Sequence, residues 1–217
     1  MTETRKKEAT NFQAIHTREL ILDEAERLIA QKGVFDLQLK DIAQPLGIRV
    51  PAIYKHYKNR DAVLVGVSKR FIIQLAQQFQ FDTEADALDG LRNALDIFVD
   101  FKIMHPAYVR LALIDFATPE GGMDYVKMAA GGDFAHNLTE GPLAHMHKRI
   151  ALLMEMGKIQ GHFREINALN FYRVMYSGIL LQLVFPDDRL LTSPPNRTSV
   201  DRVKESIRDL CLRYLCK

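Results

Sequence analysis

Cysteine is scarce in this chain of 217 residues: only Cys211 and Cys216 are present. They lie five positions apart in a segment with helical spacing, which is poor geometry for a disulfide. Because cytoplasmic proteins rarely carry disulfides, this usage predicts a reducing, cytoplasmic setting. The start of the chain, MTETRKKEAT, is polar and charged, so we expect no secretory signal. No apolar run approaches the roughly 18 residues that a membrane span needs, so we expect no membrane partner.

Residue patterns for metal binding and catalysis are also lacking. His145 and His147 are two apart and face different sides of a helix, whereas a helical metal pair needs i, i+4 spacing. His136 and His162 have no matching partners nearby. The glycines of EGGMD and AAGGD follow no strand, so they make neither a phosphate loop nor a nucleophile elbow. We expect no metal, no cofactor and no enzymatic activity.

Strand-like alternation is almost absent, and apolar residues recur at helical spacing in one segment after another. The pattern predicts an all-α fold of about nine helices. Gly33 is a natural stop for the first helix, and Pro142 can open a later one at its first position. The expected helices cover about 17–32, 39–46, 50–57, 64–79, 88–105, 106–117, 142–160, 168–185 and the C-terminal segment after the loop PDDRLLTSPPNRTS.

Three regions follow from this pattern. Residues 1–16, with RKK at 5–7, are predicted to form a mobile N-terminal arm. Residues 17–62 form a small head of three helices, and residues 63–217 form a larger helical body. Residues 118–141 are the least regular part of the body, and the pattern assigns them no role.

Charge is unevenly distributed, although the net charge is only +2. Residues 1–60 hold 11 Lys and Arg against 8 Asp and Glu, and the segment 49–60 has four bases and no acid. Within this segment, Val50, Ile53 and Tyr57 share one helical face and are expected to be buried. The opposite face begins with small residues and becomes basic.

The residues before this segment have the spacing of a helix-turn-helix. Ala43 allows close approach of two helices, Gly47 allows a tight turn, and Ile53 packs back onto the first helix. A helix whose first turn carries small residues can enter the DNA major groove, while Lys and Tyr side chains reach phosphates. The alternative is a helical hairpin with a solvated basic face.

The segment GIRVPAIYKHYKNRDAV resembles the TetR-type transcriptional regulators, with Gly47, Ile48, Ile53, Tyr54, His56, Tyr57, Arg60 and Val63 at matching positions. TRELILDEAERLIAQKG resembles the first helix of that family and DIA its second, and MEMGKIQGHF resembles the turn before its last two helices. The resemblance covers about residues 17–66. It implies double-stranded DNA with an inverted-repeat operator as one partner, a second copy of the chain as another, and a small apolar effector.

The chain departs from the family pattern at several positions. Gln38 and Leu39 stand where the family caps its second helix with Thr, and Arg49 stands where it caps the third with Ser or Thr. A missing cap costs about 0.5–2 kcal/mol. Pro51 offsets part of this loss by fixing φ in the first turn, and Pro45 predicts a short or bent second helix.

The candidate DNA-binding residues lie on and beside the third helix. Tyr54 and Arg60 match positions of phosphate contact in the family. For Arg49, Lys55 and Lys58 the alternative is a solvated surface charge, and for His56 it is packing at the helix end. The full set is Arg49, Pro51, Ala52, Tyr54, Lys55, His56, Lys58 and Arg60.

The body carries aromatic and methionine residues that suit a deformable apolar pocket. In the resembling family the same helices surround a small-molecule site, while the plainer interpretation is ordinary core. The candidate pocket residues are Phe101, Met104, Tyr108, Phe116, Met154, Tyr172, Met175 and Tyr176.

Two apolar stripes on the last two helices predict a dimer interface, because together they exceed what one core needs. Gly178 would allow close approach of a second copy, and internal packing is the alternative. The stripes contain Phe171, Met175, Gly178, Ile179 and Gln182 on one helix and Val203, Ile207, Leu210 and Tyr214 on the other.

These observations predict a dimeric, sequence-specific DNA-binding regulator, and the resemblance implies a repressor that a small apolar effector releases. Two alternatives stay open. One is a ligand-independent or activating regulator controlled by a protein partner, and the other is a helical small-molecule-binding protein or enzyme. The sequence does not define the operator, the effector, the regulated genes or the sign of regulation.

Overall fold

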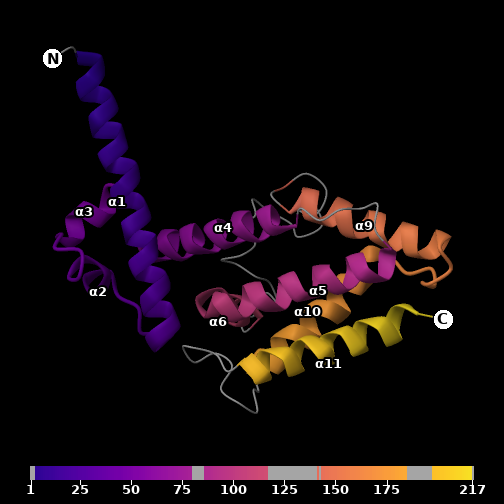
Figure 1. Ribbon diagram of the computed structural model, residues 1–217. Coiled ribbons are helices and arrows are strands. Elements are labelled where there is room, and N and C mark those ends of the chain that lie inside the picture. Colours follow the sequence, from indigo (N-terminus) through magenta and orange to yellow (C-terminus); the bar gives the residue numbers. More distant parts are fainter. Residues whose placement is uncertain (1–2, 80–85, 117–140, 142, 185–196, 217) are drawn as a thin grey trace. The chain divides into compact units, whose positions relative to one another are not determined.

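The fold of the chain is given by a computed structural model (Figure 1). It describes residues 3–79, 86–116, 141, 143–184 and 197–216. These residues form nine α-helices and no strand, which confirms the all-α prediction for the described part of the chain. The helices are α1 (Glu3–Lys32), α2 (Leu39–Ala43), α3 (Val50–Tyr54), α4 (Arg60–Gln78), α5 (Ala87–Met104), α6 (Pro106–Phe116), α9 (Ala144–Ile159), α10 (Ala168–Val184) and α11 (Arg197–Leu215).

The helices belong to two compact units. The first contains the chain up to Arg70 and α6 from Arg110 onward, and the second contains Phe71–Val109 and the chain from α9 onward. We expected the head to end at residue 62, but the first unit includes half of α4. The reason is packing: Val63, Leu64 and Val67 are fully buried, and Gly66 lies against Leu22 and Tyr57.

Helix α1 carries the core of the first unit on one stripe. Ile21, Ala25 and Ile29 are fully buried, and Ile42 and Ile53 of the next two helices are buried as well. Our expectation that this helix starts at residue 17 is wrong, because α1 already begins at Glu3. Residues 3–16 contain no Gly or Pro, so nothing in the backbone interrupts helix there.

The second unit is built around four helices. Helix α5 packs against α9 and α11, and α10 packs against the same two helices. Contacts between neighbouring helices run in opposite directions. Asp96 and Asp100 of α5 meet Arg208 and Lys204 of α11, and Gly178 and Gln182 of α10 meet Leu210 and Ser206 of α11. At the start of α5, Ala87 meets Gln160 at the end of α9, and Gly90 meets Leu153 further back along it. The four helices therefore form an antiparallel ring in which α5 and α10 lie diagonally opposite, and Figure 1 shows α11 running alongside α5.

Helix ends in this unit have clear causes. The Asp86 side chain accepts from the N–H groups of Leu88 and Asp89, which caps the start of α5. The same helix ends at Met104, and His105, the residue directly before Pro106, is not helical, because a proline disfavours helical geometry in the residue before it. At the end of α9, Gly157 faces the ring of buried Phe163 so closely that a Cβ would overlap it.

Candidate functional site

The turn between α2 and α3 has the geometry of a helix-turn-helix. Helix α2 ends at Ala43, two residues before Pro45, so the expected short second helix is confirmed. Gly47 adopts φ 63°, a left-handed conformation that glycine adopts without steric cost. Its N–H donates to the Gln44 carbonyl at 3.1 Å, and the N–H of Ile48 donates to the Ala43 carbonyl at 3.1 Å.

Helix α3 is held to the first unit by its buried face. Ile53 is fully buried and Tyr57 nearly so, while Val50 is half-buried. The Tyr57 hydroxyl donates to the Arg18 carbonyl at 3.5 Å, and the Arg18 guanidinium lies 5.0 Å from the ring centroid. Burial raises the pKa of Tyr57, so the hydroxyl stays protonated and able to donate.

The opposite face of α3 and the residues after it point outward. The Tyr54 side chain is 54% exposed, and Ala52 and His56 are half-buried. Between Asp41 and Asp61 the chain contains no acid. The exposed members of this basic face are Arg49, Pro51, Tyr54, Lys55 and Lys58.

Two charged residues near this face have roles within the unit. The Arg60 guanidinium donates to the carbonyls of Leu37 (2.8 Å) and Val34, so it ties the loop before α2 to the start of α4. This placement favours a structural role for Arg60 over the phosphate contact that the resemblance implies. Asp41 accepts from the Gln38 N–H at 3.3 Å and pairs with Lys32. This carboxylate supports the start of α2, where the sequence indicated only a missing cap.

The candidate pocket residues of the body are only partly brought together. Phe101, Tyr108, Tyr172 and Met175 are buried in the second unit, and Tyr176 is half-buried. Met104 does not join them. Its side chain is 70% exposed, because it lies on the side of α5 away from the buried Phe98 and Lys102. The side chain of Phe116 is outside the described residues.

Lys102, which sequence reasoning overlooked, lies at the centre of this group. Its side chain is completely buried on α5. The Nζ atom lies 3.2 Å from the Tyr176 hydroxyl, 3.8 Å from the Tyr108 ring centroid and 4.4 Å from the Tyr176 ring centroid. Burial holds the pKa of Lys102 well below its usual value.

The buried polar atoms of this unit that have no hydrogen-bond partner among the described residues include the Tyr172 hydroxyl and Nδ1 of His147. The two rings lie 5.5 Å apart, between α10 and α9. Burial raises the pKa of Tyr172 and lowers the pKa of His147, so both side chains are uncharged at neutral pH.

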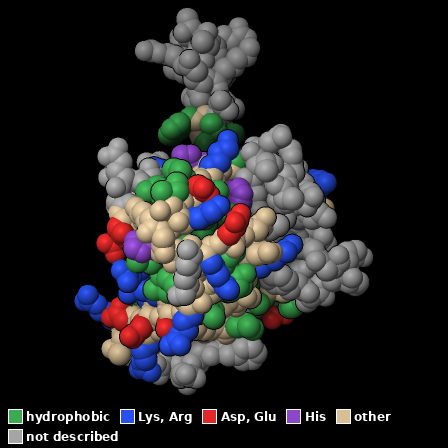
Figure 2. Space-filling model, turned by 90° about the vertical axis from the view of Figure 1, so that its right-hand side faces the viewer, with side chains coloured by type: hydrophobic (Ala, Val, Ile, Leu, Met, Phe, Trp, Pro, Cys, Tyr) green, Lys and Arg blue, Asp and Glu red, His purple; other side chains and the backbone are tan. Residues whose placement is uncertain are grey.

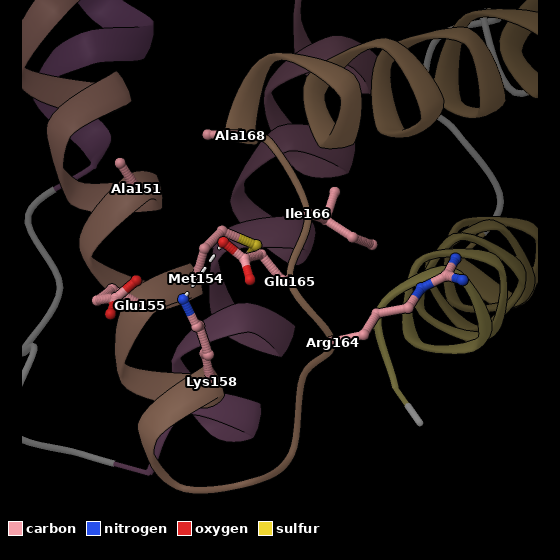
Figure 3. A pocket seen from close by; sticks show the side chains of 8 residues that line it. All are labelled: Ala151, Met154, Glu155, Lys158, Arg164, Glu165, Ile166 and Ala168. Atoms are coloured by element: carbon pink, nitrogen blue, oxygen red, sulfur yellow. Dashed lines mark ion pairs between the residues drawn. The ribbon is translucent and has the colours of Figure 1, made fainter.

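A pocket of about 210 Å³ lies elsewhere in the second unit, beside the end of α9 and the segment before α10 (Figure 3). Of the candidate pocket residues, Met154 alone lines it. Lys158 pairs with Glu165 at 3.5 Å, while Arg164 points away from that pair and donates to the Tyr214 carbonyl at 2.6 Å. The pocket is lined by charges of both signs that neutralise each other.

Most of the candidate dimer residues are used inside one chain. Phe171, Met175, Ile179, Val203 and Ile207 are buried between the helices of a single protomer. A Cβ on Gly178 would lie 2.7 Å from Leu210 of the same chain, so the glycine serves the contact of α10 with α11. Internal packing, the alternative, therefore accounts for these six. Gln182 and Tyr214 remain half-buried, and Leu210 is 40% exposed.

Other kinds of site find little support in the described residues. Among them, no group of three His, Cys, Asp or Glu side chains could hold a metal ion. No helix within the described ranges is long and apolar enough to cross a membrane. The face in Figure 2 mixes Lys and Arg with Asp and Glu, and no broad area of it carries a single sign.

Comparison with known proteins agrees with the geometry of the first unit. Residues 21–67 match the family described as bacterial regulatory proteins, tetR family. The HTH-type transcriptional regulator AcrR of Shigella flexneri is 35% identical over 89 residues, which cover 40% of this chain and 41% of that protein. The chain spans 41–50% of the length of the curated relatives that it matches.

Solved structures resemble nearly the whole fold. A bacterial regulatory protein of the tetR family from Rhodococcus RHA1 has a TM-score of 0.66 at 18% identity, over 92% of this chain and 97% of that one. The ketosteroid transcriptional regulator KstR2 of Mycobacterium tuberculosis has a TM-score of 0.62 at 17% identity, over 93% and 95%. The helix-turn-helix and the family match thus agree over residues 21–67, and nearly the whole chain shares its fold with the solved structures.

Proposed function

We propose that the protein is a sequence-specific DNA-binding transcriptional regulator that acts as a homodimer. The observation that carries this proposal is the acid-free basic face of α3 and the residues after it, which project from a helix-turn-helix whose other face is buried. Lys55, Lys58 and Arg49 supply phosphate contacts, and the first turn of α3, with Pro51 and Ala52, enters the major groove.

In this proposal the dimer forms through the side chains of α10 and α11 that stay exposed in a single chain. Leu181 is 58% and Leu210 is 40% exposed. Leu210 lies over Gly178, three positions before Leu181 on α10, and Gln182 bonds Ser206 across the two helices at 2.7 Å. The two leucines therefore share one face, and a two-fold axis through it would pair two copies and present two α3 helices to successive turns of DNA.

The sign of regulation and the release mechanism belong to the same proposal. We infer a repressor: a small apolar effector binds in the second unit, and the spacing of the two heads in the dimer shifts to one that no longer matches the operator. Structures with and without effector test this directly. Identical head spacing at full loss of DNA affinity would rule the mechanism out.

The experiment for the DNA-binding proposal is selection of bound duplexes from a random pool at two salt concentrations. We expect enrichment of an inverted repeat, with affinity that falls steeply as salt rises. Lys55→Ala should weaken binding and lower the slope of log K against log salt by about 1 if it contacts a phosphate. Lys69→Ala, an exposed lysine on α4 outside the basic face, is the matched control and should leave the slope unchanged. Weak binding that is indifferent to sequence would count against the proposal.

A further inference from the structure

The interior of the second unit holds a base where the helix pattern calls for an apolar side chain. Lys102 lies one turn after Phe98 on the buried side of α5, and its side chain is completely enclosed. Its polar neighbour is the Tyr176 hydroxyl, across the ring of four helices on α10. Lys102 therefore spans the centre of the bundle between two diagonally opposed helices.

The acids of α5 do not serve as counter-ions for this lysine. Asp96 pairs with Arg208 at 2.8 Å and Asp100 with Lys204 at 2.7 Å, both on α11. Among the described residues, no carboxylate contacts Nζ of Lys102. A buried ammonium without an anion is strongly unfavourable, and burial lowers the pKa of Lys102, which favours the neutral amine.

A second observation points to the same interior. The Tyr172 hydroxyl is buried and has no hydrogen-bond partner in the described structure. Tyr172 lies one turn before Tyr176, and its ring packs edge-on against Phe98 at 6.3 Å, one turn before Lys102. Tyr172 and Tyr176 are thus one turn apart on α10, and the residues that they contact, Phe98 and Lys102, are one turn apart on α5. An unpaired hydroxyl in such a place costs stability, and a ligand oxygen would satisfy it.

We propose that this interior is the effector site and that the effector is a monocarboxylate with an apolar body, bound by Lys102, Tyr176 and Tyr172. The inference rests on the proposed function, since it names the chemical class of the effector. One carboxylate supplies the anion that the described residues do not offer to Lys102, and it supplies two oxygens for the tyrosine hydroxyls. A phosphate would carry about two negative charges, and only a single base, Lys102, is present among the three binding residues to pair with them. Apolar side chains adjoin these groups: Phe98 packs against Tyr172 and Phe101 against Tyr108, and Met175 is buried on α10 next to Tyr176 in sequence.

Binding requires side-chain movement, because the site is enclosed. Met175 can change rotamer at low cost, and the edge-on ring pair of Phe98 and Tyr172 can separate. On binding, Lys102 takes up one proton from solvent and becomes the ammonium partner of the carboxylate. No bond is made or broken within the ligand.

The test uses the full-length protein without DNA and measures binding by isothermal titration. The probes are octanoate, decanoate and 4-phenylbutyrate, each beside the alcohol of the same carbon skeleton. We expect at least one acid to bind roughly tenfold or more tightly than its alcohol, the effect of one hydrogen bond to a charged group. Lys102→Met should remove this preference, and Lys102→Gln provides a second uncharged variant should the first fail to fold.

Lys148→Met is the matched control, since Lys148 is an exposed lysine on α9, and it should keep the preference for the acid. The inference is overturned if alcohols bind as tightly as acids, if Lys102→Met retains the preference, or if none of the acids binds. Duplex binding by the same preparations is measured separately without acid. Normal duplex binding with no acid preference overturns this inference alone, whereas acid preference without duplex binding overturns the regulator proposal.

Discussion

Lys102 is completely buried in the second unit, although lysine is among the side chains least suited to an apolar interior. Its amine is bonded to one tyrosine hydroxyl and packed against two aromatic rings. A methionine would fill a similar volume without a polar atom. At this position the chain therefore gives up stability, as residues held for binding commonly do.

We expect Lys102→Met to raise the free energy of unfolding by about 1–3 kcal/mol at pH 7, because it removes a poorly solvated amine from the core. The gain should depend on pH with a definite sign. The pKa of Lys102 is lowered in the folded protein, so between that value and 10.5 the unfolded chain binds more protons. Wild-type stability therefore rises with pH across this window, and the advantage of the variant shrinks.

Urea unfolding of both proteins at pH 7 and pH 9 measures this difference, and comparing the two proteins cancels every titrating group that they share. An advantage for Lys102→Met that grows from pH 7 to pH 9, or a variant less stable than wild type at pH 7, would contradict the argument.

At the residue scale, burial was predicted correctly where apolar residues recur at helical spacing. It was missed where a charged residue occupies one of those positions. Ile53 and Tyr57 were predicted to be buried from spacing alone, and they are. Lys102 continues the stripe of Leu91, Leu95 and Phe98 at the same spacing. Its position was thus readable as interior, but a search for apolar and aromatic residues passed over a base.

At the scale of elements, the turn between α2 and α3 concentrates several backbone constraints in a few residues. Pro45 stops α2, Gly47 reverses the chain at φ 63°, and Pro51 fixes the first turn of α3. A Cβ on Gly47 would meet no atom within 4 Å, so only its backbone conformation restricts the residue. The two helices keep their relative angle through this conformation.

We expect Gly47→Ala to lower the free energy of unfolding by about 1 kcal/mol, the cost of a left-handed conformation for a residue with a Cβ. Gly47→Asn should cost less, because asparagine tolerates that region. Thermal or urea unfolding of the wild type and the two variants ranks their stabilities. Equal losses for Ala and Asn would mean that steric contact, not backbone conformation, restricts the position.

The sequence predicted which segments form helices better than it predicted where each helix begins and ends. The described helices follow from apolar spacing, and the ends of α2 and α5 follow from Pro45 and Pro106. The start of α1 was missed because residues 3–16 lack an apolar stripe, although nothing in them breaks a helix. Gly178 was assigned to a dimer contact because spacing cannot tell which helix a glycine faces. The candidate DNA-binding residues remain predictions of individual contacts.

At the scale of the whole molecule, the proposed activity needs two copies. A single α3 is only five residues long and reads only a short segment of one groove. A two-fold dimer reads two half-sites about one helical turn of DNA, ~34–36 Å, or a multiple apart. The free energies of the two contacts add only while the dimer holds, so dimer stability sets operator affinity.

Leu181→Arg should therefore weaken both the dimer and the operator complex. A charge on the exposed face of α10 repels its copy across a two-fold axis, and Leu210→Arg tests the same face from α11. Leu152→Arg is the matched control, since Leu152 is 47% exposed on α9, outside this face. Sedimentation measures the dimer, and titration of the selected inverted repeat and of its half-site measures DNA binding.

The discriminating result is the comparison of affinity for the inverted repeat with affinity for its half-site. The Leu181 and Leu210 variants should lose affinity for the inverted repeat but bind the half-site as the wild type does, because their first units are unchanged. A variant that stays dimeric, or that loses half-site binding as well, would mean that the two copies meet elsewhere or that the substitution disturbs the head.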